Sequence, residues 1–328
     1  MKSIILGRTG LPISRLGLGC MGMSENYGPS DDAESLKLLA RALDLGINFL
    51  DTADSYGPFH NEELIGKFLA GRRERLVVAT KFGFVRSNDP DAPVIDNSPD
   101  YIRNACEGSL RRLRVEVLDL YYAHRIDPAR PIEETVGAMA ELVRAGKVRA
   151  LGLSEVSART LRRAAAVHPI TAVQSEYSLW ERGVEREVLP ACRELGVSFV
   201  AFAPLGRGFL TGAVANIAAL AADDYRRQLP RFQGDAAAHN QGLVAQLAVI
   251  AREHHCSAGQ LALAWLLARS PEVIPIPGTR RMQRLEENVA AVDIVLTPET
   301  RVRLDALFAP GAVAGERYDA DGMRLVDR

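Results

Sequence analysis

The sequence predicts an α/β fold: a single (β/α)8 TIM barrel with an N-terminal β-hairpin and long loops at the C-terminal rim of its strands. Short apolar, β-like runs alternate with segments of helical periodicity, and this strand–helix unit occurs eight times along the 328 residues. No Pro-, Ser- or Gly-rich linker and no change of composition divides the chain. Because α/β barrels often have this length, one domain over residues 1–328 is expected.

The first half of the chain accounts for the hairpin and four units. Two short apolar runs flank the turn Gly7-Arg8-Thr9-Gly10, which predicts a β-hairpin. Ser98 before Pro99 is a helix start, because a capping hydroxyl precedes Pro at the first helical position. The expected pairs are strand 16–19 with helix 31–45, strand 47–51 with helix 61–70, strand 76–81 with helix 99–113, and strand 118–123 with helix 132–145.

The second half continues the alternation and adds one long connection. Gly146 and Gly196 follow helices where a left-handed residue is favoured, and Thr297 with Pro298 marks a further helix start. Residues 205–235 are too many for an ordinary connection, and such loops are often functional lids or disordered. The expected elements are strand 148–153 with helix 157–167, strand 171–176 with helix 184–195, strand 197–202 with helices around 236–254 and 257–269, and strand 273–276 with helix 281–291.

Composition excludes several classes of function. A formal net charge of −1 with scattered Lys and Arg offers no basic stripe for nucleic acid, so a small-molecule partner is expected. The N-terminus lacks the continuous apolar stretch of a signal peptide, and no long apolar run suggests a membrane span, so the protein is expected to be cytoplasmic. The four cysteines are widely spaced without a CxxC pair, which favours reduced thiols and no metal site; neighbouring positions in His254-His255-Cys256 do not face one point on a helix.

Four polar residues near strand ends indicate a reaction. Asp51, Lys81 and His124 each end or directly follow an apolar run, and Tyr56 lies shortly after the first of them. The C-terminal ends of barrel strands meet at one rim, so these side chains are expected to lie together. A phenol coupled to an ammonium and a carboxylate, with an imidazole beside it, can transfer a proton to a carbonyl oxygen. Alone, each residue has an ordinary structural explanation; the combination and spacing favour carbonyl chemistry.

The motifs around these residues continue along nearly the whole chain. They are Asp51-Thr-Ala-Asp-Ser-Tyr56-Gly57, Ala79-Thr-Lys81-Phe-Gly83, Asp119-Leu-Tyr-Tyr-Ala-His124-Arg125, Gly152-Leu-Ser154, Gln174, Pro204-Leu-Gly-Arg-Gly208 and Pro277-Gly-Thr279 through Glu287-Asn288. In these motifs and their order the chain resembles the aldo-keto reductase family, most closely its bacterial members related to potassium-channel β subunits.

This resemblance implies an NADPH/NADP+ cofactor and catalysis by Asp51, Tyr56, Lys81 and His124. Phe202 takes the place of an aromatic ring, often Tyr, that stacks on nicotinamide. Thr279, Arg280 and Arg284 lie where the family holds the 2′-phosphate, and guanidinium groups suit a phosphate. The cofactor residues it implies are Met21, Asp51, Ser154, Gln174, Phe202, Ala203, Pro204, Leu205, Gly206, Gly208, Gly278, Thr279, Arg280, Arg284, Glu287 and Asn288.

Two departures from the family pattern affect these expectations. Gly278 replaces a lysine found in many relatives, which leaves the phosphate to the arginines and bears on the preference for NADPH. Glu155 stands where an amide is frequent, and it is expected to add negative charge near the nicotinamide or the substrate. Tyr27 and Trp180 fall on expected upper loops, either lining the substrate pocket or packing on the barrel.

Two other reductase folds are disfavoured. Gly17-Leu-Gly19-Cys-Met-Gly22 matches the GxGxxG pattern of Rossmann folds, but residues 24–29 intervene where a helix should begin. The Tyr-x-x-x-Lys pattern of short-chain dehydrogenases occurs at none of the eight tyrosines. The leading hypothesis is therefore NADPH-dependent reduction of an aldehyde or ketone by a barrel enzyme. The alternative is a cofactor-binding regulatory or redox-sensing subunit with slow turnover.

Overall fold

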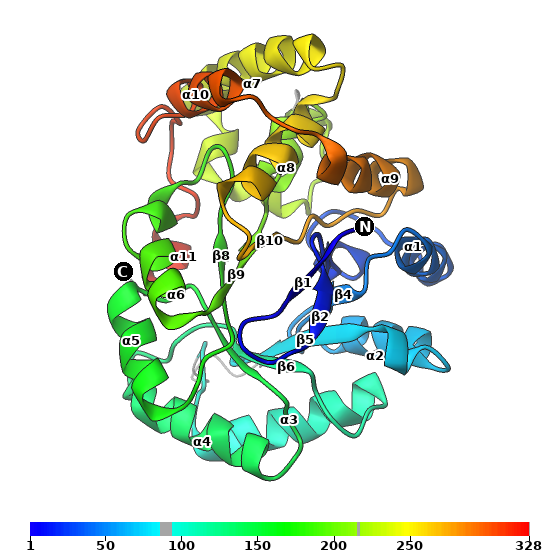
Figure 1. Cartoon of the computed structure of the whole chain (residues 1–328), viewed down its shortest axis with the longest axis vertical. Coiled ribbons are helices and arrows are strands. Elements are labelled where there is room, and N and C mark those ends of the chain that lie inside the picture. Colours follow the sequence, from blue (N-terminus) through cyan, green and yellow to red (C-terminus); the bar gives the residue numbers. More distant parts are fainter. Residues whose placement is uncertain (86–93, 215–216, 328) are drawn as a thin grey trace.

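The computed structural model describes residues 1–85, 94–214 and 217–327, and among them eight parallel strands form one curled sheet. A parallel bridge between Gly19 and Gly278 links the first strand to the segment after the last one, so the sheet closes into a barrel (Figure 1). The (β/α)8 prediction is confirmed. The strands are β3 (Leu18–Gly19), β4 (Phe49–Asp51), β5 (Val77–Phe82), β6 (Leu120–Ala123), β7 (Leu151–Ser154), β8 (Ala172–Glu176), β9 (Ser198–Phe202) and β10 (Val273–Pro275), each paired with its neighbour in chain order.

Helices surround the strands, and α7 and α10 add an outer layer against α8 on one side (Figure 1). The hydroxyls of Ser98 and Thr297 accept backbone N–H groups of the first turns of α3 and α10, as the sequence predicts. The helices are α1 (Asp32–Asp44), α2 (His60–Leu69), α3 (Pro99–Leu113), α4 (Ile132–Arg144), α5 (Ala158–Val167), α6 (Val188–Leu195), α7 (Gly234–Glu253), α8 (Ala258–Arg269), α9 (Met282–Ala290), α10 (Pro298–Leu307) and α11 (Ala320–Arg324).

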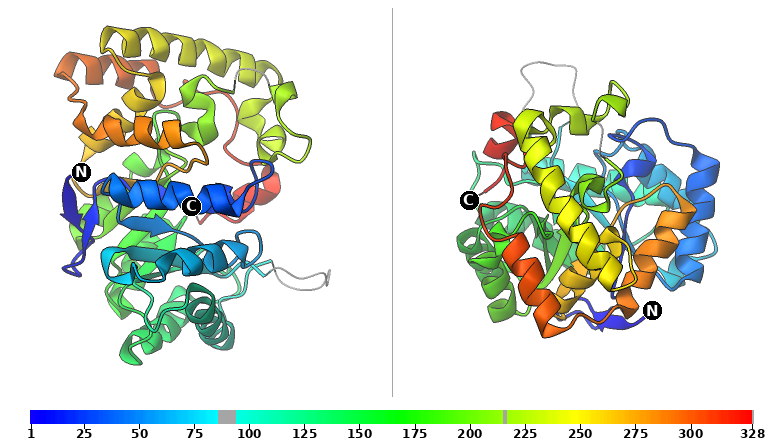
Figure 2. Two further views of the ribbon diagram at one scale, coloured as in Figure 1. Left: turned by 90° about the vertical axis from the view of Figure 1, so that its right-hand side faces the viewer. Right: turned by 90° about the horizontal axis from the view of Figure 1, so that it is seen from above.

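The predicted N-terminal hairpin closes one end of the barrel. It pairs β1 (Ser3–Ile5) with β2 (Pro12–Ser14), and Leu6 and Ile13 are buried among side chains of the barrel interior. In the side view, the hairpin and residues 217–232 lie at opposite ends of the barrel (Figure 2, left). The cavity described below opens at the other end, which carries the C-termini of the strands.

Three local predictions differ from the structure. Helix α6 begins at Val188 rather than at residue 184, because a longer helix would place Pro190 in its interior, where the ring removes a hydrogen bond. The predicted loop 205–235 contains 3-10 helices at Gly206–Thr211, Ile217–Ala219, Tyr225–Gln228 and Pro230–Phe232; residues 215 and 216 lie outside the described part. Helix α11 follows the barrel and has no counterpart in the predicted elements.

The GxGxxG segment does not open a Rossmann helix. After β3 the chain forms a 3-10 turn at Met21–Met23, and the next helix begins only at Asp32. A Cβ atom on Gly19 would lie 2.8 Å from the carbonyl oxygen of Ile276, so this glycine permits the close approach that seals the barrel.

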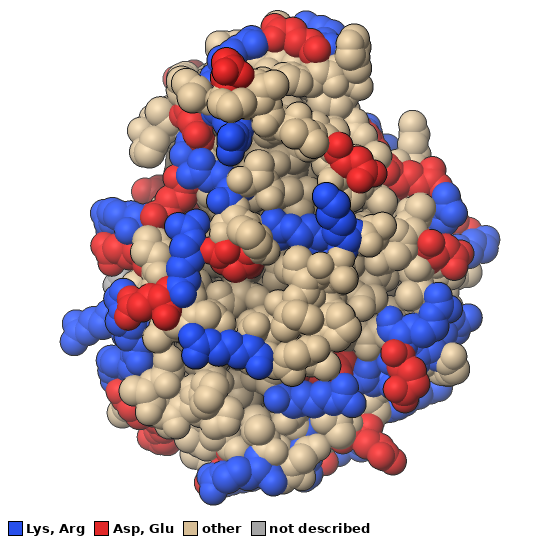
Figure 3. Space-filling view, viewed as in Figure 1, with Lys and Arg blue, Asp and Glu red and all other residues tan. Residues whose placement is uncertain are grey.

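On the face shown in Figure 3, basic and acidic side chains are interspersed. Many of the exposed charges form pairs, such as Arg163 with Glu133 and Arg162 with Glu194. No helix in the described ranges is long and apolar enough to cross a bilayer.

Candidate active site

A cavity of about 1140 Å³ opens at the C-terminal ends of the strands. Gly19, Asp51, Ser154 and Phe202, the last residues of β3, β4, β7 and β9, all line it. Parallel strands place their C-terminal ends at one rim, so residues far apart in the sequence share this space.

Asp51, Lys81 and Tyr56 form a buried chain at the floor of the cavity. The Nζ atom of Lys81 lies 2.5 Å from Oδ1 of Asp51 and 3.1 Å from the hydroxyl oxygen of Tyr56, and it also donates to the carbonyl of Thr52 at 2.8 Å. Lys81 is fully buried in β5, whereas Asp51 and Tyr56 line the cavity. The ammonium therefore lies behind the tyrosine and is shielded from solvent.

His124 follows β6 and stands beside the tyrosine. Its ring centroid is 5.8 Å from that of Tyr56, with the planes nearly perpendicular, and 4.8 Å from that of Phe84. The Nδ1 atom of His124 lies 3.5 Å from the hydroxyl of Ser55. The imidazole and the phenol thus border the same part of the cavity, as the spacing predicts.

Burial governs the protonation of this group. Burial raises the pKa of Tyr56, and the charge of Lys81 opposes that rise without cancelling it. Burial likewise raises the pKa of Asp51 against the effect of Lys81, while the pKa of Lys81 is raised because Asp51 and Tyr56 together outweigh its desolvation. The charge of Lys81 thus favours the phenolate of Tyr56, but desolvation of the phenol has the larger effect on its pKa.

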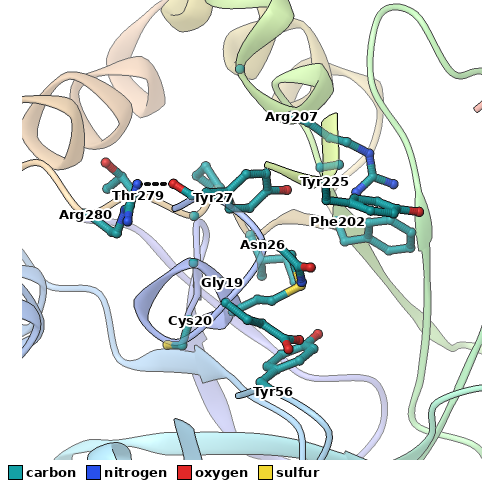
Figure 4. A pocket seen from close by; sticks show the side chains of 18 of the residues that line it. Gly19, Cys20, Asn26, Tyr27, Tyr56, Phe202, Arg207, Tyr225, Thr279 and Arg280 are labelled. Atoms are coloured by element: carbon teal, nitrogen blue, oxygen red, sulfur yellow. Dashed lines mark hydrogen bonds between the residues drawn. The ribbon is translucent and has the colours of Figure 1, made fainter. Parts of the chain in front are cut away.

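The strands β7, β8 and β9 supply the next wall. The Nε2 atom of Gln174 donates to Oδ2 of Asp51 at 2.7 Å, so this amide also orients the carboxylate that holds Lys81. Ser154 and Phe202 line the cavity on either side of Gln174. The labelled side chains in Figure 4 include Phe202, with Tyr225 and Arg207 close to it.

The segment after β9 runs along the cavity, but its glycines differ in role. Ala203, Pro204, Leu205 and Gly208 line the space. Gly206 does not: it is buried, its φ is +57°, and a Cβ atom would lie 2.6 Å from the Trp180 ring. Glycine at 206 is thus required by its conformation and by the neighbouring indole.

The opposite end of the cavity is formed by the turn after β10 and the start of α9. Arg284 pairs with Glu287 at 2.5 Å. Arg280 donates to the backbone carbonyls of Tyr27, Gly28 and Pro29 and so ties the loop before α1 across this end (Figure 4). The predicted residues that line this end are Met21, Gly278, Thr279, Arg280, Arg284, Glu287 and Asn288.

Of the two candidate substrate residues, one lines the cavity and the other does not. Tyr27 lines the cavity. Trp180 is outside its lining: the indole is 4 % exposed and packs on Phe209 and Phe232 at centroid distances of 4.8 Å and 5.7 Å. Of the two roles expected for Trp180, the structure shows the second: it is a loop aromatic that packs on its own barrel.

Glu155 does not bring a free negative charge to the cavity. Its carboxylate pairs with Arg317 and accepts the backbone N–H of Glu176, and the residue is 3 % exposed. The charge expected near the nicotinamide is compensated by an arginine from the C-terminal segment.

Sequence reasoning missed several cavity residues. Arg125, Arg207, Tyr225 and Tyr318 line the cavity without having been assigned to it. The guanidinium of Arg207 lies 5.2 Å from the ring centroid of Tyr318 and pairs with Glu176 at 3.3 Å. For Arg125 a signal was available, because it directly follows His124. Tyr225 lies in a short 3-10 helix and Tyr318 in an irregular segment, and no periodicity identifies either of them.

Comparisons with known proteins agree with this geometry. A model of the Aldo/keto reductase family matches residues 15–309. The structure is similar to the glycerol dehydrogenase AKR11B4 from Gluconobacter oxydans, with a TM-score of 0.86 and 30% identity over 96% of this chain and 97% of that one. It is also similar to the holo form of the aldo-keto reductase AKR11C1 from Bacillus halodurans (TM-score 0.77, 31% identity, 98% and 99% covered).

A third similar structure is an aldo/keto reductase from Klebsiella pneumoniae in complex with NADP and acetate (TM-score 0.75, 28% identity, 97% and 99% covered). Both the family match and these likenesses extend over nearly the whole chain. The chain belongs to the aldo/keto reductase family of NADP-dependent oxidoreductases that act on carbonyl groups.

Proposed function

We propose that this protein reduces an aldehyde or ketone to the alcohol with NADPH and that Tyr56 is the proton donor. The observation that carries the proposal is the chain from Asp51 through Lys81 to Tyr56, which ends with a phenol on the cavity wall. An isolated phenol is a weak acid, and the buried ammonium behind it stabilises the phenolate that remains when the proton has left.

Each of the four residues has its own role in the proposed reaction. When bound, NADPH supplies a hydride from its nicotinamide ring. Tyr56 holds its proton at neutral pH, since its pKa is raised, and gives it to the oxygen of the substrate carbonyl. Asp51 keeps Lys81 charged in a site without solvent, and His124 orients the same oxygen or donates to it, which stabilises developing negative charge.

The residues of the cavity fit the proposed cofactor. Ser154 and Gln174 offer polar groups for the nicotinamide carboxamide, and the ring of Phe202 lies beside them for stacking. The segment from Ala203 to Gly208, with glycine at its cavity-lining end, allows its backbone to approach a pyrophosphate. A volume of about 1140 Å³ accommodates a dinucleotide together with a small substrate.

A preference for NADPH rests on the far end of the cavity. Arg280 is committed to three backbone carbonyls, so Thr279 and Arg284 are the side chains we assign to the 2′-phosphate, with Glu287 and Asn288 beside the adenine. We also propose that residues 1–328 form one domain. The C-terminal segment packs on the barrel, where the Asp327 N–H donates to the carbonyl of Glu155, and this contact supports the proposal.

Turnover tests this proposal directly. The purified protein, mixed with NADPH and a panel of neutral and charged aldehydes and ketones, should show loss of NADPH absorbance with at least one of them. Since the related Gluconobacter protein is a glycerol dehydrogenase, the panel should include alcohols with NADP+ for the reverse direction. Tight NADPH binding without turnover on the whole panel would favour the regulatory-subunit alternative.

A further inference from the structure

Arg125 places a cation beside the reacting groups. It directly follows His124, it lines the cavity, and its guanidinium carbon lies 5.6 Å from the ring centroid of Phe84, which also contacts His124. Burial raises the pKa values of Tyr56 and of Tyr318, and the charge of Arg125 opposes that rise at both. The guanidinium is therefore within electrostatic range of the proposed proton donor and of the tyrosine from the C-terminal segment.

The hydrogen-bonding edge of this guanidinium is largely uncommitted. Only Nη1 donates among the described contacts, to the carbonyl of His124 at 2.7 Å and to the Ser154 hydroxyl at 3.4 Å. Nε is covered by protein and makes no hydrogen bond within the described residues. Nη2 also has no acceptor among the described contacts, so the guanidinium of a cavity-lining side chain retains donor capacity for a carboxylate or phosphate.

Two neighbouring arginines of the cavity, unlike Arg125, form ion pairs with acidic residues. Arg207 pairs with Glu176 at 3.3 Å, and Arg226 pairs with Asp224 at 2.7 Å. Arg125 forms no ion pair with any acidic residue in the described ranges. A buried donor without an acceptor is costly, so a cavity with this cation favours an occupant that carries a negative charge.

We propose that Arg125 binds an anionic group of the substrate, so that the enzyme favours carbonyl compounds with a carboxylate or phosphate a few atoms from the reacting carbon. This inference rests on the proposed reductase function. Arg125 is thereby a residue that sets substrate specificity, while proton transfer stays with Tyr56.

The test compares matched substrates and matched variants. The wild-type protein, Arg125→Gln, Arg125→Lys and Arg130→Gln are assayed with NADPH and two pairs: 4-oxobutanoate with its methyl ester, and glycolaldehyde phosphate with glycolaldehyde. Arg130 lies on the same loop and pairs with Glu134 at 2.7 Å, away from the cavity lining, so it controls for general loss of charge. Thermal unfolding and NADPH binding verify that each variant folds.

We expect the wild type to favour the anionic member of at least one pair, and the pair that responds identifies the anion as carboxylate or phosphate. Arg125→Gln should lower kcat/KM for that member by about ten- to a hundredfold, mainly through KM, because a charge-assisted hydrogen bond is lost. The neutral partner should change little, and Arg130→Gln should match the wild type. Arg125→Lys should lie between them, since it keeps the charge and loses the planar guanidinium with its several donors. It also remains informative if the Gln variant does not fold.

Two results would overturn the inference: equal losses for both members of each pair in Arg125→Gln, or no preference for either anion in the wild type. Failure of the reductase function is recognised separately, as absence of turnover with every aldehyde. In that case calorimetric titration of the NADP+ complex with 4-oxobutanoate and glycolaldehyde phosphate decides the question. Weaker binding of either anion to Arg125→Gln supports the anion site, and equal binding or none rejects it.

Discussion

The Nζ atom of Lys81 lies 3.1 Å from the hydroxyl oxygen of Tyr56 and 2.5 Å from the Oδ1 atom of Asp51. The lysine is fully buried, so its charge depends on these two neighbours rather than on solvent. The arrangement couples the protonation of the phenol to a buried ion pair. Each residue of the chain can therefore be tested by a different measurement.

Tyr56→Phe should bind NADPH as the wild type does and lose carbonyl reduction, because the change removes the hydroxyl and keeps the ring. A loss of about 10²–10⁴-fold or more in kcat is expected for removal of a general acid. Steady-state assays and NADPH fluorescence titration measure the two properties. Near-wild-type turnover would exclude Tyr56 as the proton donor.

Lys81→Met should lower kcat and move the alkaline limb of the pH profile to higher pH, because the Tyr56 pKa rises further when the opposing charge is lost. The single variant also leaves the Asp51 carboxylate buried without its partner, which costs roughly 3–5 kcal/mol of stability. The double variant Asp51→Asn with Lys81→Met should recover stability without recovering activity. A rate and pH profile equal to those of the wild type would reduce Lys81 to a structural role.

Arg284→Ala should weaken NADPH binding by about ten- to a hundredfold and leave NADH almost unchanged, since only NADPH carries the 2′-phosphate that we assign to this guanidinium. Glu287→Gln is the matched control, because Arg284 pairs with Glu287 at 2.5 Å and part of its effect could pass through that contact. Fluorescence quenching with both cofactors gives the affinities. Equal weakening of NADPH and NADH would assign Arg284 to the fold.

Arg317→Ala should lower the free energy of unfolding by about 3–5 kcal/mol, because it leaves the buried charge of Glu155 unpaired. Arg324→Ala removes an exposed arginine from the same C-terminal segment and should cost no more than about 1 kcal/mol. Urea denaturation measures both. If the two variants are equally stable, the C-terminal segment is not anchored through Glu155.

Asp54 gives the stability a pH dependence. Burial raises its pKa from 3.8 to about 8, with the charge of Glu62 adding to the effect. The folded protein therefore binds this proton more tightly than the unfolded chain, and the resulting stabilisation is complete below about pH 3.8 and is lost as pH rises through about 8. Asp54→Asn should be more stable than the wild type at pH 9, with a flatter slope between pH 5 and 9 in denaturation experiments. An unchanged slope would contradict the raised pKa.

The sequence by itself determined the barrel and identified the four residues that we propose take part in the reaction. Strand and helix periodicities, the caps at Ser98 and Thr297 and the glycine at 196 are local patterns, so they specify their elements without knowledge of distant residues. The proximity of Asp51, Lys81 and His124 could be predicted from the sequence, because a parallel barrel places the C-terminal ends of all its strands at one rim.

The tertiary structure decided how neighbouring side chains are used. Arg317 neutralises Glu155 across 162 positions, Arg280 is held by carbonyls about 250 positions away, and Trp180 is buried over Gly206 rather than facing the cavity. These contacts join irregular segments, which have no period that a sequence pattern could reveal. Likewise, the sequence shows that Arg125 directly follows His124. Whether the Arg125 guanidinium meets an acidic partner depends on the tertiary structure, and Nε has no hydrogen-bond partner among the described residues.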